Sequence, residues 1–400
     1  MNESANDLHV VAKSDALAGK RIDVVISGSI AAIESVRFIR SLRRIGADVT
    51  PWLSHGGSNF ITPMSVGWAA GKEPVTGFSG SATHIATSHA VVIAPASSSI
   101  LAKIARGMTD SHCTALVASA LGQTKPVIIL PAMHDSLKSA PALLEHLAKI
   151  SSWKNVHILN AREDEGKQKF PEPDTLADQV AHIVNAPTRS NLSVLVTMGT
   201  TRGYIDDVRY ISNYSSGKLG SLISEELYRQ GFKTTVIAGP SENLPRVASD
   251  IRPVFTTSEM LRECEDASAH GLAAGIFCAS VLDYEPAEKT IGKIKSGNDT
   301  LTVSFKPTPK IIEKINVSSG AKIGFKLEIG LSEAEGKKLA ENYITKYGLS
   351  AIILNELSAV SATKHKAWAF TKDNISGPPV TLSSKSEIAR FIASTVAGKI

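Results

Sequence analysis

Short apolar runs alternate with amphipathic stretches through the first half of the chain. The runs rich in β-branched and other apolar residues are 21–27, 48–54, 90–95 and 126–131. The segment from Ile30 onward carries an apolar spacing that predicts a helix with a core-facing stripe, formed by Ile33, Val36, Ile39 and Leu42. Strands that alternate with helices predict a parallel, doubly wound sheet. The loops at the carboxyl ends of such strands are expected to carry a ligand.

The same pattern returns in the second half of the chain. Strands are predicted at 192–198, 233–240, 273–280, 351–356 and 366–371, and a closing helix at 386–396. An amphipathic helix is predicted at 174–184, followed by a linker at 185–191. We therefore expect an α/β protein of two doubly wound, Rossmann or flavodoxin-like, three-layer domains with mainly parallel sheets. The expected domains are residues 1–188 and 189–400.

Composition narrows the class of protein. A chain of 400 residues suits two domains with separate cores. The net charge of +5 is scattered without a dense basic block, which favours small anionic ligands over nucleic acid. No apolar stretch predicts a membrane helix, and the N-terminus lacks a signal-peptide pattern. Cys113, Cys264 and Cys278 lack ligand spacing and are interpreted as reduced core residues of a cytoplasmic protein.

Residues 209–220, RYISNYSSGKLG, lie between a predicted strand and a helical pattern. This order places loop amides and a helix N-terminus at one end of a parallel sheet, where an anion is favoured. Lys218 opposes the helix dipole in the first turn, which a bound anion would explain. The alternative is a polar loop with Ser216 as a helix N-cap. Neither the P-loop spacing nor a dinucleotide-binding fingerprint is present.

Residues 197–202 and 206–220 closely resemble the start of phosphopantothenate-cysteine ligase. That ligase is commonly fused behind a flavin-dependent phosphopantothenoylcysteine decarboxylase in coenzyme A biosynthesis. The resemblance implies that CTP and Mg²⁺ activate the carboxylate of 4'-phosphopantothenate as an acyl cytidylate, which the amine of L-cysteine then attacks. We expect Arg209 and Asn213 to orient the acyl cytidylate, and Lys293 to offset charge on the triphosphate.

Later residues match further parts of the ligase pattern. Asp283 follows a predicted strand, where the ligase aspartate contacts CTP; the simpler interpretation is an Asx turn. Within the basic stretch from Lys289 to Lys310, residues 292–295 resemble the Lys-x-Lys-Lys arm of the ligase, with Ser296 in place of its last lysine. The stretch also suits an edge hairpin whose lysines prevent aggregation. The resemblance identifies no metal ligands, and it implies nucleotide binding by Ala279, Asp283, Lys293, Pro309, Lys310, Ile311, Ile312, Phe325 and Lys346.

The loops of the first half resemble those of the FMN-binding decarboxylases, over roughly residues 20–185. Glycine and hydroxyl residues at strand-to-helix turns suit a phosphate, although such hydroxyls are also ordinary N-caps. The resemblance implies a catalytic histidine at His84 and decarboxylation through a thioaldehyde with FMN as the redox cofactor. The implied FMN-binding residues are Gly28, Ser29, Thr62, Ser97, Asp110, Ser111 and Met133.

The first half also departs from many bacterial decarboxylases. It has His134 where they carry asparagine, and its flap at 160–173 lacks their proton-donating cysteine. A proton donor is still needed after carbon dioxide leaves, and His134, Lys167 and Glu165 are the candidates. His134 and this flap resemble the archaeal-type branch of the fused enzyme.

Two alternatives to the bifunctional enzyme stay open from the sequence. One is a ligase with an inactive flavin domain, and the other is a flavin-binding regulatory or assembly module. The resemblance further implies ligase dimers and flavin-domain trimers, hence a homo-oligomer. Composition and charge predict neither a membrane nor a nucleic-acid partner.

Overall fold

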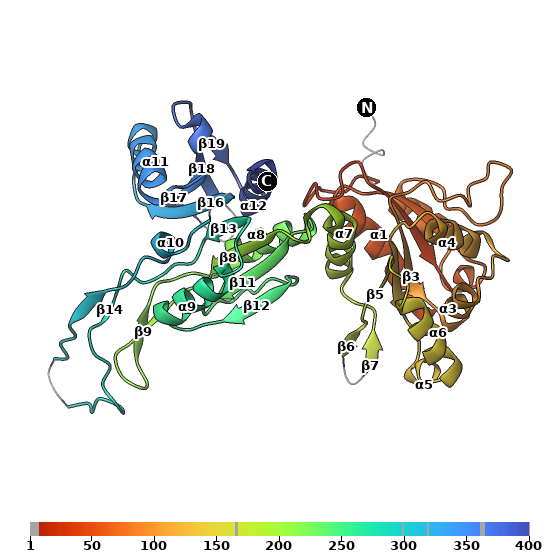
Figure 1. Cartoon of the computed structure of the whole chain (residues 1–400), viewed down its shortest axis with the longest axis horizontal. Coiled ribbons are helices and arrows are strands. Elements are labelled where there is room, and N and C mark those ends of the chain that lie inside the picture. Colours follow the sequence, from red (N-terminus) through yellow and green to blue (C-terminus); the bar gives the residue numbers. More distant parts are fainter. Residues whose placement is uncertain (1–7, 165–166, 298–299, 318–319, 361–364, 400) are drawn as a thin grey trace. The chain divides into compact units, whose positions relative to one another are not determined.

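The computed structural model describes residues 8–164, 167–297, 300–317, 320–360 and 365–399. Its contacts divide the chain into two compact units, Met1–Pro187 and Thr188–Ile400. Each unit has helices on both faces of a central sheet (Figure 1). Within the described part of the chain, no helix has both the length and the apolar character to cross a membrane.

The first unit is built on a fully parallel five-stranded sheet in the order β2-β1-β3-β4-β5. The chain moves outward in one direction through β2 and in the other through β3, so β1 and β3 flank the point where the strand order reverses. Ligands of doubly wound sheets bind beyond the carboxyl ends of such strands. The strands are β1 (Arg21–Ile26), β2 (Asp48–Leu53), β3 (Ala90–Ala96), β4 (Val127–Pro131) and β5 (Val156–Ile158), followed by the hairpin of β6 (Arg162–Asp164) and β7 (Lys167–Lys169).

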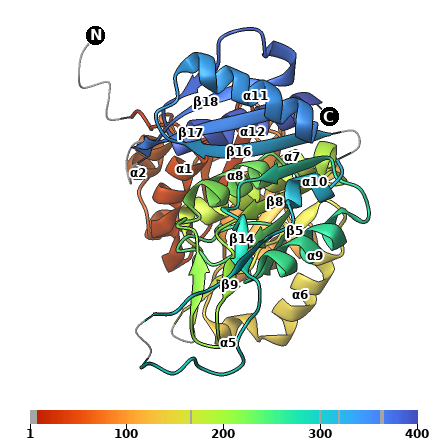
Figure 2. The ribbon, with the colours of Figure 1, turned by 90° about the vertical axis from the view of Figure 1, so that its left-hand side faces the viewer.

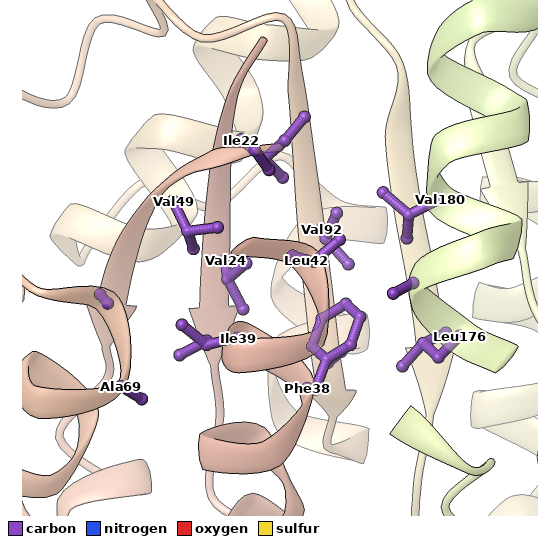
Figure 3. Packing of buried hydrophobic residues seen from close by; sticks show 14 of the residues in the cluster. Ile22, Val24, Phe38, Ile39, Leu42, Val49, Ala69, Val92, Leu176 and Val180 are labelled. Atoms are coloured by element: carbon purple, nitrogen blue, oxygen red, sulfur yellow. The ribbon is translucent and has the colours of Figure 1, made fainter. Parts of the chain in front are cut away.

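Alternate side chains of these strands feed two hydrophobic clusters, one on each face of the sheet. On one face, Phe38 and Leu42 of α1 meet Leu176 and Val180 of α7, as Figure 3 shows. The other face is covered by α3, α4 and α6. The helices are η2 (Ile30–Glu34), α1 (Ser35–Arg44), η3 (Gly57–Asn59), α2 (Pro63–Ala70), α3 (Ser98–Arg106), α4 (His112–Gly122), α5 (Asp135–Lys138), α6 (Pro141–Ser151) and α7 (Pro173–Arg189).

The second unit is built on an eight-stranded sheet in the order β12-β11-β8-β13-β16-β17-β18-β19. Its pairs are parallel except β17–β18 and β18–β19. Here β8 and β13 flank the reversal of strand order, so their carboxyl ends are the expected ligand edge. The strands are β8 (Ser193–Met198), β11 (Lys233–Ala238), β12 (Asp250–Pro253), β13 (Ala274–Phe277), β16 (Ala321–Glu328), β17 (Ala351–Val360), β18 (His365–Thr371) and β19 (Val380–Leu382).

Two short ladders extend from the ligand edge of this sheet. One pairs β9 (Arg202–Tyr204) with β10 (Tyr210–Ser212), and the other pairs β14 (Tyr284–Pro286) with β15 (Phe305–Pro307). Both views place β9 beside β14 (Figures 1 and 2). Of the helices, α8 and α12 cover one face of the sheet, and α9, α10 and α11 the other. They are α8 (Lys218–Arg229), α9 (Thr257–Ser268), α10 (Ile311–Lys314), α11 (Glu333–Tyr347), η4 (Lys372–Asn374) and α12 (Lys385–Lys399).

The predicted fold class, two doubly wound α/β units with mainly parallel sheets, is confirmed. Three local predictions are wrong. Ile33 lies in the 3-10 helix η2 and is 54% exposed, because the tighter turn rotates it away from the stripe of α1. The expected linker is helical as far as Arg189, with Pro187 in the last turn of α7. Residues 300–304, expected within the edge hairpin, form no strand, and β15 begins only at Phe305.

Candidate active sites

In the first unit, a buried serine ties together the loops that follow β1 and β3. The Ser27 hydroxyl donates to the Pro95 carbonyl at 2.8 Å and accepts from the Ser97 amide at 2.8 Å. Its side chain is only 2% exposed, so both hydrogen bonds are shielded from water. This role of Ser27 could not be predicted from the sequence, because the Ser97 amide that it binds lies 70 positions away.

Two of the predicted FMN-binding residues join neighbouring loops to the same edge. The Ser29 hydroxyl donates to the Ala132 carbonyl at 2.9 Å, beside Met133 at the end of β4. A Cβ on Gly28 would lie 3.0 Å from the carbonyl oxygen of Gly56, so a side chain there would press on the loop after β2. The structure therefore brings Gly28, Ser29, Met133 and, through Ser27, Ser97 to one edge.

Four more of the predicted FMN-binding residues differ in whether their side chains already form contacts within the protein. They are Thr62, Ser97, Asp110 and Ser111. Thr62 caps α2 by accepting from the Ser65 amide, and Ser111 caps α4. The Asp110 carboxylate pairs with Lys103 at 2.7 Å, and this hydrogen bond holds the pKa of Asp110 below its usual range. Ser97 begins α3 without a capping hydrogen bond from its side chain. The N-terminus of α3 is thus the one of these three helix starts whose capping residue leaves its hydroxyl available to a ligand.

His84 lies on the loop between α2 and β3, in a column of aromatic rings. Its ring meets Phe78 edge-on with centroids 6.0 Å apart, and Phe78 in turn meets His112 at 6.3 Å. His112 is stacked on Trp52 at 6.1 Å, and its Nε2 lies 3.1 Å from the Leu53 carbonyl oxygen. Burial lowers the pKa of His112, so this ring is a neutral support. The sequence analysis missed His112, which connects the His84 loop to the start of α4.

His134 begins the short helix α5 and is exposed. Its Nδ1 accepts from the Ser136 amide at 3.2 Å, so a neutral ring carries its proton on Nε2. The flap forms the hairpin of β6 and β7. Lys167 lies in β7, whereas Glu165 lies outside the described residues.

In the second unit, the loops after β8, β10 and β13 meet at the predicted ligand edge. The Ala279 amide donates to the hydroxyl of Thr197 in β8 at 3.3 Å, and Thr197 is 2% exposed. The Asn213 side-chain amide donates to the Val281 carbonyl at 3.1 Å. The residues predicted to orient the acyl group and to bind the nucleotide therefore lie on adjoining loops.

The start of α8 has the features of an anion-binding turn. Gly217, with φ +72°, occupies the N-cap position, where a Cβ would lie 2.6 Å from the Ser241 Cβ. Ser216 is therefore not the N-cap residue, and its hydroxyl receives only a long bond of 3.5 Å from the Lys218 amide. Lys218 is exposed in a first turn that holds no acidic residue. Its unfavourable position relative to the helix dipole is consistent with a bound anion.

Several of the predicted nucleotide-binding residues lie around the short helix α10. The Lys310 ammonium pairs with the Asp283 carboxylate, and the Thr308 amide donates to the Asp283 carbonyl at 3.0 Å. This pairing fixes the loop after β13 against the start of α10, which carries Ile311 and Ile312. Lys346, at the end of α11, lies 3.7 Å from Glu313 of α10. The structure thus gathers these residues around α10.

Strand β16 presents Phe325 and the residue after it to opposite faces of the sheet. Phe325 packs on the cluster under α8 and α12, whereas a Cβ on Gly324 would touch Ile312 on the other face. Lys326 alternates back to the face of Gly324. Gly324 is paired with Phe277, the last residue of β13, and Lys326 lies two residues beyond that pair along β16.

Lys326 is a further cation near the predicted nucleotide-binding residues, within the stretch 324–328 that the resemblance to the ligase places at the nucleotide. Its ammonium lies 3.3 Å from the Glu328 carboxylate, and its side chain is 35% exposed. Burial acts to lower the pKa of Lys326, but Tyr343, Glu328 and Asp283 outweigh it and raise the pKa. Asp283, one of the predicted nucleotide-binding residues, is among the negative charges that raise this pKa.

The lysine arm, defined here as residues 289–297, is attached to the turn that carries Arg209. The Arg209 guanidinium donates to Asp206 at 3.2 Å and to the Ile294 carbonyl at 3.2 Å. Lys293 is exposed and makes no ion pair with any described residue. Within the described ranges, no group of three or more His, Cys, Asp and Glu side chains could hold a metal ion.

Two family models match the chain, one in each unit. Residues 10–185 match the family described as Flavoprotein, and residues 190–399 match the DNA/pantothenate metabolism flavoprotein C-terminal domain. Among solved structures, the DNA/pantothenate metabolism flavoprotein of Streptococcus pneumoniae is 27% identical, with a TM-score of 0.47, and the match covers 52% of this chain and 99% of that one.

Curated relatives match across both units. The coenzyme A biosynthesis bifunctional protein CoaBC of Thermococcus kodakarensis is 34% identical, over 90% of this chain and 91% of its own length. The protein of the same description from Escherichia coli is 30% identical, over 86% and 87%. The higher identity to the archaeal relative agrees with the features of His134 and the flap. The chain therefore belongs to the family of coenzyme A biosynthesis bifunctional proteins.

Proposed function

We propose that this chain converts 4'-phosphopantothenate to 4'-phosphopantetheine in two consecutive steps of coenzyme A biosynthesis. The observation that carries the proposal is a match to bifunctional relatives over 90% of the chain, with a separate family model on each half. Residues 1–188 are proposed as the decarboxylase and residues 189–400 as the ligase. The comparisons give no support to a ligase with an inactive flavin domain.

In the ligase, CTP activates the carboxylate of 4'-phosphopantothenate, forming an acyl cytidylate and releasing pyrophosphate. The amine of L-cysteine then attacks the acyl carbon, CMP leaves, and the amine loses a proton. Lys293, Lys310 and Lys346 offset the negative charge of the triphosphate and of the leaving pyrophosphate. Mg²⁺ is proposed as the companion of CTP, because triphosphates are commonly bound with this cation.

Arg209 and Asn213 are proposed to orient the acyl cytidylate. A guanidinium has five N–H groups. Asp206 and the Ile294 carbonyl each accept one of those of Arg209, which leaves donors for a phosphate or an acyl oxygen. Asn213 is held at the end of β13 through the Val281 carbonyl, so its side chain approaches the acyl group from a fixed position.

The first unit fits FMN at the edge formed by β1, β3 and β4. The uncommitted Ser97 hydroxyl and the N-terminus of α3 suit its phosphate, and Gly28, Ser29 and Met133 lie on adjoining loops. Bound FMN would supply the reversible oxidation that makes the carboxylate a leaving group. His84 is proposed to act at the reacting thiol, and His134 to return a proton from Nε2 after carbon dioxide leaves.

The test is product analysis by mass spectrometry after the full chain is incubated with 4'-phosphopantothenate, L-cysteine, CTP, Mg²⁺ and FMN. Phosphopantetheine is the expected product. Accumulation of phosphopantothenoylcysteine would refute the decarboxylase assignment, and absence of both products would refute the whole proposal. Replacing CTP by ATP, or omitting Mg²⁺, tests the nucleotide and metal assignments separately.

The assembly state and compartment are parts of the same proposal. A homo-oligomer with ligase dimers and flavin-domain trimers predicts a mass well above that of one chain in light scattering. The cytoplasm is the proposed compartment, because the three cysteines are free thiols, as a reducing environment would keep them.

A further inference from the structure

Asp206 is a buried carboxylate at the turn between β9 and β10. It is 0% exposed, although turns of this kind normally lie in water. Its Oδ1 accepts from the Val208 amide at 2.8 Å and from the Arg209 amide at 2.6 Å, which closes the turn on itself.

The other carboxylate oxygen faces the lysine arm. Asp206 Oδ2 accepts from the Ile294 amide at 3.1 Å and from the Arg209 guanidinium at 3.2 Å. Arg209 completes the connection by donating to the Ile294 carbonyl at 3.2 Å. One carboxylate therefore joins the backbone of the residue after Lys293 to the side chain of Arg209.

An exposed set of contacts borders this buried one. Asp207 accepts from the Gly292 amide at 2.7 Å and pairs with Lys289 at 2.6 Å, while the Asp207 amide donates to the Gly292 carbonyl. Apolar packing contributes little here, because Ile291 is 95% exposed. Polar contacts thus hold the arm to the turn.

From this geometry we propose that Asp206 is a positioning residue of the ligase, which holds Arg209 and Lys293 in one unit so that both cations reach the acyl cytidylate and triphosphate together. The inference rests on the proposed ligase function. Burial alone would raise the pKa of Asp206, but its amide and guanidinium donors outweigh burial and keep the group ionised. An ionised carboxylate in this position orients the Arg209 guanidinium by accepting one of its N–H groups. Other N–H groups of the guanidinium can still donate to a ligand.

The test is a double-mutant cycle in the full chain, with Asp206→Asn and Lys293→Met. The asparagine keeps the size of the side chain but sets an N–H group against the Ile294 and Arg209 donors. With CTP as the varied substrate, kcat/KM for phosphopantothenoylcysteine formation should fall about 10- to 100-fold in Asp206→Asn, the scale for loss of charged hydrogen bonds. In the Lys293→Met background the same change should cost less than in the wild-type background, because the part of its effect that acts through Lys293 is already lost.

Trypsin cleavage after Lys293 and Lys295 reports on the arm independently of catalysis. Cleavage should be several-fold faster in Asp206→Asn than in the wild-type chain. Asp250→Asn removes a carboxylate that pairs with Arg252 elsewhere in the unit, and it should leave both cleavage and kcat/KM unchanged. Independent, multiplying effects of Asp206→Asn and Lys293→Met would overturn the inference, as would unchanged cleavage of the arm.

A second variant covers the case in which Asp206→Asn does not fold, as judged by circular dichroism. The pair Asp207→Asn and Lys289→Met opens the exposed contacts and leaves Asp206 buried. It should change cleavage of the arm and kcat/KM only modestly, because exposed ion pairs contribute little and Asp206 still holds the arm. Full release of the arm in this variant would overturn the inference. If the wild-type chain makes no product, the proposed function fails, whereas the cleavage comparison still decides whether Asp206 holds the arm.

Discussion

The substitution Ser27→Ala tests whether the loops after β1 and β3 must be tied together for the flavin to bind. It removes a hydroxyl that is 2% exposed and that bridges the Pro95 carbonyl and the Ser97 amide, both at 2.8 Å. Each buried group left unpaired costs about 1–3 kcal/mol. The Pro95 carbonyl keeps a second donor, the Ser27 amide at 3.3 Å, so the Ser97 amide is the group that loses its partner, and the expected cost is about 1–3 kcal/mol.

This cost falls on the loop arrangement that carries the proposed FMN-binding residues. Since each 1.4 kcal/mol corresponds to about a factor of ten, FMN should bind about 10- to 100-fold more weakly to Ser27→Ala. The assay is titration of the flavin-free full chain with FMN, followed by quenching of flavin fluorescence. Thermal unfolding of the apoprotein, followed by circular dichroism, measures how much of the cost appears without ligand.

The matched control is Ser152→Ala, which removes an exposed hydroxyl that donates to the Lys149 carbonyl at 2.8 Å at the end of α6. It should bind FMN as the wild-type chain does. Wild-type affinity in Ser27→Ala would refute the reasoning, because the bridge would then be dispensable for the site. Equal weakening in both variants would also refute it, since the loss would not be specific to the edge formed by β1 and β3.

Further predictions concern both units. Lys326→Met should raise KM for CTP about tenfold, the scale of one charge-assisted bond, whereas Lys322→Met, at the other end of β16, should not. His134→Asn should slow decarboxylation about 100-fold or more without affecting ligation, so that phosphopantothenoylcysteine accumulates in the product analysis. The Thr197→Val variant loses the acceptor of the Ala279 amide and should bind CTP about tenfold more weakly in calorimetric titration. Burial would raise the pKa of Glu225, but its arginine partners outweigh burial and lower it; unfolding free energy should therefore fall as the pH drops below the ordinary value of 4.5, and less so in Glu225→Gln.

The strands of the two sheets can be predicted from the sequence because a strand that is buried on both faces is a nearly continuous apolar run. The run from Ile22 to Ile26 holds residues that feed clusters on both sides of the sheet, and such strands are apolar at nearly every position. Helix starts are likewise local signals, as Thr62 and Ser111 illustrate. The prediction that Ile33 faces the core was wrong because a 3-10 turn and the first turn of an α-helix have the same apolar spacing at this length.

The contacts that assemble the sites could not be predicted in this way. Asp206 and Ile294 are 88 positions apart, and their hydrogen bond depends on how two separate ladders lie at the end of the sheet. The column from Trp52 to His84 depends equally on the packing of a loop against the start of α4. Sequence patterns specify which elements form, whereas such contacts follow from the register between elements.

Both units use the same kind of hydrogen bond to connect the two strands at the reversal of strand order. In each, a buried hydroxyl at the carboxyl end of the unit's first strand accepts a hydrogen bond from an amide of the loop after the neighbouring strand. Ser27, directly after β1, accepts from Ser97, and Thr197 of β8 accepts from Ala279. Both pairs of strands flank the reversal of strand order, where helices diverge to opposite faces and leave the loop amides without helical partners. A side-chain acceptor there satisfies one amide of the loop and fixes the loop against the neighbouring strand. This arrangement explains physically why two different anionic ligands, a flavin phosphate and a nucleotide, are both assigned to this edge of the sheet.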